Sequence, residues 1–281
     1  MNKPTLLSHF DEIYKDVKLL GAGNFGETHL VYDKRSKKYY SLKLLYPHDT
    51  PIKDYYREVE ALKFLSKRCY PNIVCYVNHF IIKGYTNYKN KFINQTYYGI
   101  LTEYINGVTL DQYKNQHQLS YKHILYISLW LLKTLSLIHS LGLAHNDIST
   151  SNIMITHQGQ LKLIDFGLSC ITSHPTFYNT CMKNRLVNEK YVSPEIQSGL
   201  YSMNVNYFSK TSDVFSSGLV LYELFTGFRP YRQDQHGNII SDYRDIQRAP
   251  CLNLILKKML MIDPYKRSSA QQAYTNLLKC N

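Results

Sequence analysis

Residues 143–155 read LAHNDISTSNIMI, and residues 163–169 read LIDFGLS. Asp147 and Asn152 stand five positions apart in the first stretch, and Asp165 opens the second after a short β-like run. Carboxylate and amide oxygens suit Mg²⁺, and an aspartate can also orient a hydroxyl group and accept its proton. The two stretches therefore predict a site where a metal ion and a positioned nucleophile act together.

Further toward the N-terminus, GAGNFGET (residues 21–28) supplies three glycines between two expected strands. Glycines let backbone N–H groups come close to phosphates, although a glycine-rich hairpin is also a common turn. Lys43 lies in the strand-like YYSLKLL, and Glu58 lies on the helix expected after it. Taken alone, either residue could be an ordinary surface charge, and only the downstream motifs favour a functional interpretation.

The chain changes character near residue 108. Residues 14–46 alternate as three antiparallel strands would, residues 54–67 show helical spacing, and residues 108–281 read mainly as helices. Further strands are expected at 73–82 and 97–104, and short ones around 153–164. This pattern predicts an α+β protein in a single domain, 1–281. Its parts are an N-lobe of about residues 1–101 with a small antiparallel sheet and one main helix, a hinge at 102–107, and a larger, mostly helical C-lobe at 108–281.

Composition is that of an ordinary globular protein, with 44% hydrophobic and 19% charged residues. The net charge of +12 favours acidic partners, but no nucleic-acid-binding motif accompanies it. The six cysteines show no C-x-x-C pair and no metal-ligand spacing with histidine, so neither a disulfide framework nor a zinc site is predicted. These cysteines favour a reducing compartment, and we expect a cytoplasmic protein, in the host cytoplasm if the source is a virus or an intracellular pathogen.

The longest apolar stretch, residues 124–144, approaches the length of a membrane span. Lys133 and several Ser and Thr residues interrupt it, and the loop containing Asp147 follows directly. We therefore expect a buried helix and no membrane span. The sequence does not indicate the oligomeric state.

Ten motifs, in order along the chain, resemble those of eukaryotic-type protein kinases: GAGNFG, Lys43, Glu58, PNIV, LTEYING, HNDISTSN, DFG, SPE, SDVFSSG and DPYKR. The resemblance covers nearly the whole chain. It implies the two-lobed kinase fold and the transfer of the γ-phosphate of ATP, with Mg²⁺, to Ser or Thr of protein substrates, possibly acidic ones.

The resemblance also assigns roles to individual residues. Asp147 is expected to accept the substrate hydroxyl proton, Lys43 to bind the α- and β-phosphates and pair with Glu58, and Asn152 and Asp165 to bind Mg²⁺. Thr102 matches the gatekeeper. The expected ATP-binding residues are Gly21, Ala22, Gly23, Asn24, Phe25, Gly26, Thr28, Ser41, Lys43, Thr102, Glu103, Ile105 and Met154. Asp213 matches the anchor of the catalytic loop, and Glu195 and Arg267 match a structural ion pair.

The chain also departs from the family pattern. Asn146 replaces the arginine of the catalytic loop, and Ser149 replaces a lysine that many Ser/Thr kinases place near the γ-phosphate. Two alternatives to an active protein kinase remain open at this point. One is a nucleotide-binding pseudokinase scaffold. The other is a weak atypical kinase or ATPase similar to the kinase of the tRNA-modifying KEOPS complex.

Overall fold

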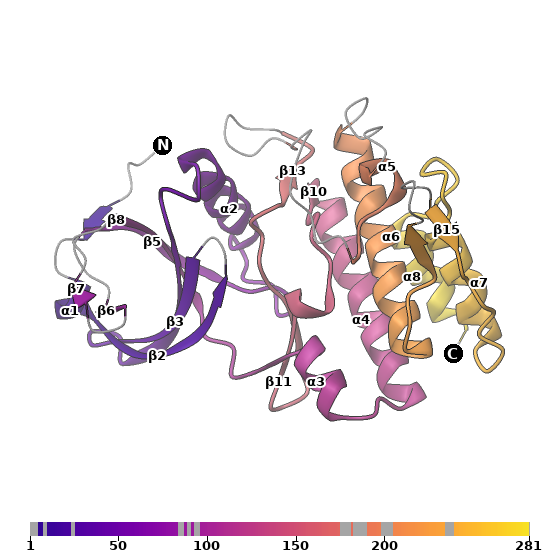
Figure 1. Cartoon of the computed structure of the whole chain (residues 1–281), viewed down its shortest axis with the longest axis horizontal. Coiled ribbons are helices and arrows are strands. Elements are labelled where there is room, and N and C mark those ends of the chain that lie inside the picture. Colours follow the sequence, from indigo (N-terminus) through magenta and orange to yellow (C-terminus); the bar gives the residue numbers. More distant parts are fainter. Residues whose placement is uncertain are drawn as a thin grey trace. The chain divides into compact units, whose positions relative to one another are not determined.

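The computed structural model describes residues 5–7, 10–23, 26–83, 87–88, 91–92, 96–174, 181, 190–197, 205–233 and 239–280. The chain forms two compact units, Met1–Asn106 and Gly107–Asn281, whose elements are labelled in Figure 1. The division falls inside the stretch predicted as a hinge. The fold is the expected one, with an antiparallel sheet in the first unit and mostly helices in the second.

Unit 1 is built around a six-stranded sheet with the strand order β1-β5-β8-β4-β3-β2. The three strands predicted within residues 14–46 are present and antiparallel, whereas β1, which was not predicted, pairs in parallel with β5. The expected helix at 54–67 begins slightly earlier, directly after Pro51. The elements of unit 1 are β1 (Thr5–Leu7), α1 (Phe10–Ile13), β2 (Tyr14–Gly23), β3 (Gly26–Asp33), β4 (Lys38–Leu45), α2 (Ile52–Leu65), β5 (Tyr76–Lys83), β6 (Asn87–Tyr88), β7 (Lys91–Phe92) and β8 (Thr96–Glu103).

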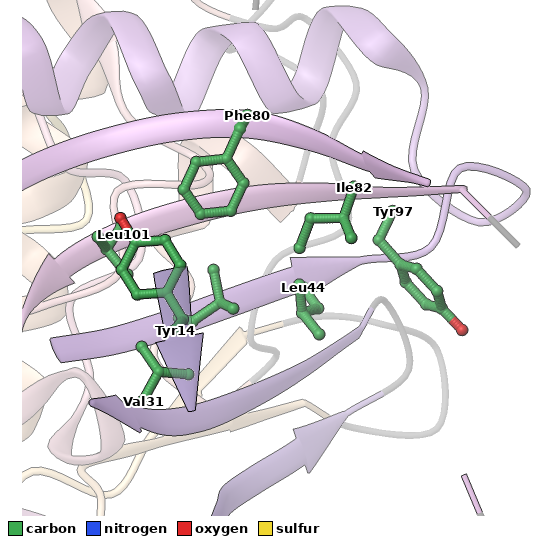
Figure 2. Close-up of a cluster of buried hydrophobic side chains, with 8 residues drawn as sticks. Tyr14, Val31, Leu44, Phe80, Ile82, Tyr97 and Leu101 are labelled. Carbon is green, nitrogen blue, oxygen red and sulfur yellow. The ribbon is translucent and has the colours of Figure 1, made fainter. Parts of the chain in front are cut away.

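Side-chain alternation along β4 separates the core of this sheet from its functional face. Leu42 and Leu44 point into a buried cluster on one face, which Figure 2 shows packed around Phe80. Gly99 makes this packing possible, because a Cβ atom there would lie 2.7 Å from the Phe80 ring. Lys43, between the two leucines, must point to the opposite face, since successive strand side chains alternate. The other members of the cluster are Tyr14, Val31, Ile82, Tyr97 and Leu101.

Unit 2 is arranged around two long helices, α4 and α6. The predicted buried helix is α4, which begins after the N-cap Ser120 and buries side chains such as Trp130 and Leu135. Among the described residues, no helix combines the length and the apolar character that crossing a bilayer requires. The elements of unit 2 are β9 (Gly107–Thr109), α3 (Leu110–Gln116), α4 (Tyr121–Ser140), β10 (Leu143–Ala144), the 3₁₀ turn η1 (Thr150–Asn152), β11 (Ile153–Thr156), β12 (Leu161–Leu163), β13 (Cys170–Ile171), α5 (Pro194–Gln197), α6 (Val205–Thr226), β14 (Tyr231–Gln233), β15 (Ile239–Ser241), α7 (Pro250–Met259) and α8 (Ala270–Leu278).

The prediction that the cysteines form no disulfide framework was wrong. The structure joins them as Cys69–Cys75, Cys170–Cys181 and Cys251–Cys280, with Cα–Cα separations of 5.0, 4.9 and 5.8 Å. These separations lie in the range that a disulfide spans. Spacing along the chain did not reveal the pairs, because the fold, and not a local motif, brings the partners together.

Candidate active site

In unit 1 the predicted nucleotide-binding residues gather on the face of the sheet that carries Lys43. Thr28 lies opposite Lys43 on the neighbouring strand, and Ser41 lies opposite Thr102. Because paired residues share a face and residues two apart on one strand do too, all four side chains project to the same side. The sequence-predicted group is thus a single surface.

Lys43 is fixed on this surface by an ion pair with α2. Its Nζ atom lies 2.9 Å from both carboxylate oxygens of Glu58. The Glu58 side chain is only 6% exposed, whereas that of Lys43 is 27% exposed. Apolar side chains on the same helix, among them Val59 and Leu62, are buried and hold it in place. The predicted ion pair is therefore present, and it leaves the ammonium group partly accessible.

The glycine-rich hairpin joins β2 to β3 beside this surface. Gly26 has no room for a side chain, since a Cβ atom would lie 1.9 Å from the carbonyl oxygen of Leu44. At Gly21 and Gly23, by contrast, a Cβ atom would meet nothing within 4 Å. Ala22 pairs with Glu27 across the hairpin. Asn24 and Phe25, also predicted to bind ATP, lie outside the described residues.

The end of β8 carries the residues predicted to contact adenine. The Glu103 carboxylate accepts a hydrogen bond of 2.8 Å from the backbone N–H of Cys75, and the Glu103 N–H donates to the Cys75 carbonyl. Its side chain is therefore used to hold the preceding loop. Ile105, which follows, is 7% exposed.

In unit 2 the catalytic loop is anchored by Asp213, as predicted. The two carboxylate oxygens of Asp213 accept hydrogen bonds from the backbone N–H groups of His145 and Asn146, at 2.8 and 2.6 Å. His139 lies 2.9 Å from the same carboxylate. The His145 ring contacts Phe166 edge-on, with ring centroids 4.7 Å apart, and lies 3.0 Å from the Ile164 carbonyl. The loop is thereby held to α6, α4 and the segment around Asp165.

Asp147, Asn152 and Asp165 form the second set of predicted residues. The Asn152 amide nitrogen donates to both the carbonyl and the carboxylate of Asp147, at 2.8 Å each, which leaves the amide oxygen as the atom able to bind a cation. The Asn152 carbonyl accepts from Ile164 N at 2.9 Å, next to Asp165. Asp165 is exposed and has a left-handed backbone, with φ 59°.

This donor set fits Mg²⁺ brought in with a nucleotide better than a resident metal ion. Mg²⁺ is typically held by one or two protein oxygens together with substrate phosphates. Asn152 and Asp165 offer such oxygens. No group of three or more His, Cys, Asp or Glu side chains suited to a metal occurs in the part of the chain that the structure describes.

Met154 and Ser149 complete the predicted set in unit 2. Met154 lies on β11, where it pairs with Thr109 and Lys162. Ser149 is 1% exposed, and its hydroxyl lies 3.3 Å from that of Ser151. The position that often carries a lysine therefore holds a short, buried hydroxyl group.

Sequence reasoning missed a network that ties the catalytic loop to α3 and α6. The Thr150 hydroxyl donates to Asp111 at 3.0 Å and lies 3.2 Å from the Tyr191 hydroxyl, which donates to Glu223 at 2.9 Å. Lys114 contacts both carboxylates of the network, Asp111 and Glu223. These residues are far apart in sequence, so no local motif marked them.

A second feature that sequence reasoning missed is a charged cluster in the β2–β3 hairpin. His29 Nδ1 lies 3.0 Å from Asp16 on β2, and Nε2 lies 3.3 Å from Glu27, within ion-pair distance but outside hydrogen-bond geometry. Burial disfavours the charged ring, but the two carboxylates outweigh it and raise the pKa of His29 to about 9.

We expect this cluster to make stability depend on pH. The folded pKa of about 9 lies above the ordinary value of 6.5, so the stabilisation is complete below pH 6.5 and is lost as pH rises through about 9. The loss should be on the order of 1–2 kcal/mol. Urea unfolding of the native protein and of His29→Gln across this range measures it. His48→Gln, which removes an exposed histidine, should behave like the native protein, and an identical pH profile for His29→Gln would contradict the assignment.

Glu195 and Arg267 form the predicted structural ion pair. Arg267 donates two hydrogen bonds to the carboxylate, at 2.7 and 3.0 Å, and both side chains are almost completely buried. The guanidinium also donates to the carbonyls of Met261 and Thr211 and lies 4.8 Å from the centre of the Phe215 ring. This pair joins the short helix α5 to the segment before α8.

Comparison with known families agrees with this architecture. The sequence profile described as "Protein kinase domain" matches residues 14–277. Calcium-dependent protein kinase 4 of Plasmodium falciparum is 26% identical over 94% of this chain and 49% of its own length. Putative mitogen-activated protein kinase 14C of Drosophila melanogaster is 27% identical over 89% of this chain and 65% of its own length. Serine/threonine-protein kinase KIC1 of Saccharomyces cerevisiae is 25% identical over 78% of this chain and 18% of its own length. The chain thus spans about half the length of the Plasmodium relative.

Proposed function

Because this chain belongs to the protein kinase domain family, we propose that it is an active enzyme that transfers the γ-phosphate of ATP to Ser or Thr side chains of proteins. The observation that carries the proposal is the contact of 2.8 Å between Asn152 and Asp147. It holds the proton-accepting carboxylate and directs the amide oxygen of Asn152 away from it, where it can bind a cation. Residues 1–281 act as a single catalytic domain in this proposal.

Each residue then has a distinct task. Asp147 orients the acceptor hydroxyl and takes its proton, and Lys43, held by Glu58, binds the α- and β-phosphates. Asn152 and Asp165 hold Mg²⁺, which when bound neutralises charge on the phosphates. The backbone of Gly21, Gly23 and Gly26 and the face carrying Thr28, Ser41 and Thr102 bind the nucleotide, with Glu103, Ile105 and Met154 at the adenine.

Magnitudes favour an active enzyme over a pseudokinase scaffold. The lysine missing at Ser149 would contribute one charge-assisted contact to phosphate, worth about 1.5–3 kcal/mol, or roughly ten- to a hundredfold in rate. Every residue expected to hold metal or the nucleophile is retained. Slower transfer is therefore expected, but not its loss. The retained SPE and SDVFSSG segments also distinguish the chain from the KEOPS-type alternative.

A radiolabelled ATP assay tests the proposal. The native protein and Asp165→Ala are compared on mixed acidic and basic protein substrates with Mg²⁺, and the labelled residues are identified by acid hydrolysis. Label on Ser or Thr with the native protein alone is the expected result. Equal, negligible transfer by both proteins would contradict an enzymatic function and would favour the scaffold.

We expect acidic peptides to be the better substrates. Net charge favours them, and the carboxylates beside the catalytic loop, Asp111 and Glu223, already contact Lys114. Lys114→Met should uncover these carboxylates and raise the relative phosphorylation of basic peptides several-fold. The native preference should shrink as ionic strength rises beyond about 0.15 M.

Lys133→Met is the matched control for this prediction. It removes the same charge from an exposed position on α4, so the peptide preference should stay close to that of the native protein. Preference for basic peptides by the native enzyme at low salt would contradict the prediction.

We place this activity in the cytoplasm, that of the host if the source is a virus or an intracellular pathogen. ATP and protein hydroxyl groups are both abundant there. Disulfides in a reducing compartment are usually transient and serve redox sensing or catalysis.

A further inference from the structure

One of the three disulfides lies directly against the catalytic loop. Cys170 is on β13, pairs with Ala144 on β10 and is 1% exposed. The Asn146 amide nitrogen donates to the Leu168 carbonyl at 3.1 Å and contacts the Cys170 sulfur at 3.3 Å. The disulfide to Cys181 therefore begins at the side chain that replaces the loop arginine.

The contacts of Asn146 restrict what this side chain can do. Its amide nitrogen is used on Leu168 and Cys170, and its backbone N–H is held by Asp213. A neutral amide cannot make the bidentate, charge-assisted contact by which an arginine holds a phosphate group. Phosphorylation of the segment after Asp165 thus lacks its usual receptor at this position.

The disulfide supplies a different kind of anchor at the same place. It links Cys181 covalently to Cys170, and Cys170 is fixed through the β10–β13 pair and Asn146 to the catalytic loop. The connection to α6 is completed by Asp213 and by the Ser209 hydroxyl, 3.5 Å from the Cys170 sulfur. A cross-link between residues separated by 11 positions also restricts the chain when it is not otherwise ordered.

The other two disulfides have no such position. Cys69–Cys75 closes the connection between α2 and β5, and Cys251–Cys280 joins the start of α7 to the residues after α8. Neither contacts the loop that carries Asp147. They provide internal controls for a change of redox state.

We propose that Cys170 and Cys181 are a redox-controlled anchor of the segment that follows Asp165, and that the disulfide form is the active one. The activity in this proposal is the phosphoryl transfer proposed above. Oxidation fixes Cys181 to the catalytic loop, where kinases with a loop arginine use a phosphate. Reduction releases it.

A small-molecule disulfide of the glutathione type is the oxidant. Cys181 is partly exposed and Cys170 is buried, so the Cys181 thiolate attacks first. One sulfur of the oxidant bonds to Cys181, and the other leaves as a thiolate. The Cys170 thiolate then attacks the Cys181 sulfur, the protein disulfide forms, and a second small thiolate leaves. Two electrons pass from the cysteines to the oxidant, and the two thiol protons end on the released thiols or in solvent.

The test compares oxidised and reduced protein. Full-length native protein is equilibrated with glutathione disulfide or with dithiothreitol, its linkages are mapped by mass spectrometry, and kcat/KM is measured without re-equilibration. Reduction should lower kcat/KM about tenfold or more, because the rate follows the population of the anchored form. Cys181→Ser should match the reduced native protein in both buffers, whereas Cys280→Ser should keep the native response.

A second measurement does not depend on activity. Hydrogen exchange of peptides covering residues 143–147 and 168–172 should speed up on reduction in the native protein and in Cys280→Ser, but should already be fast in Cys181→Ser. If exchange responds in this way and no form transfers phosphate, the anchor is supported and the proposed function fails. If the native protein transfers phosphate equally in both buffers with unchanged exchange, or if no Cys170–Cys181 linkage is found after oxidation, the redox anchor is overturned.

Discussion

Asp147→Asn is expected to lower the rate of phosphoryl transfer by about 10²- to 10⁴-fold while leaving nucleotide affinity close to native. An amide has the shape of the carboxylate but cannot accept the hydroxyl proton. Its oxygen can still accept the hydrogen bond from Asn152, whose amide nitrogen lies 2.8 Å from the Asp147 carboxylate. The loop should therefore keep its structure. Single-turnover transfer, together with binding of Mg²⁺–ADP, separates the two quantities.

Asp165→Asn provides the contrast. This substitution removes a charge from the expected metal site, so it should weaken nucleotide binding in the presence of Mg²⁺ more than in its absence. Asp49→Asn removes a carboxylate far along the sequence from both motifs and should change neither quantity. Equal losses of Mg²⁺-dependent affinity in the Asp147 and Asp165 variants would contradict the separate roles.

Arg267→Met should destabilise unit 2 by about 3–5 kcal/mol, the effect expected when one partner of a buried ion pair is removed. The substitution leaves the Glu195 carboxylate, 1% exposed, without its two charged hydrogen bonds. The carbonyls of Met261 and Thr211 lose a donor as well. Urea unfolding followed by Trp130 fluorescence reports on unit 2, because this residue is the only tryptophan of the chain and lies on α4.

Two further variants make the stability measurement specific. The double variant Glu195→Leu with Arg267→Met should be more stable than Arg267→Met alone, since no unpaired charge is then buried. Lys266→Met removes the adjacent, exposed cation, which lies 3.7 Å from Asp263, and should cost less than about 1 kcal/mol. A loss for Arg267→Met as small as that for Lys266→Met would show that the buried pair does not hold α5 in place.

Much of the fold and of the candidate site could be predicted from local sequence. Alternation in residues 14–46 predicted the three strands, and the same periodicity put Lys43 on the face opposite Leu42 and Leu44. The apolar stretch at 124–144 predicted the buried α4. The pairs Lys43–Glu58 and Glu195–Arg267 and the anchor Asp213 followed from the ordered kinase motifs. Each of these inferences rests on a pattern that is visible within one segment or on a set of motifs in fixed order.

Other features depend on which segments meet in three dimensions. The cysteine spacing indicated no disulfides, yet the β10–β13 pair and the turn of the chain bring Cys170 and Cys181 together at Asn146. Lys114 reaches Glu223 although more than a hundred positions separate them. Sequence by itself determined the elements, their buried faces and the residues suited to phosphate and metal, because periodicity and short motifs act locally. Only the tertiary structure decided the disulfides, the Thr150 network and the charged contacts of His29, because these depend on distances between side chains whose backbones approach one another only after folding.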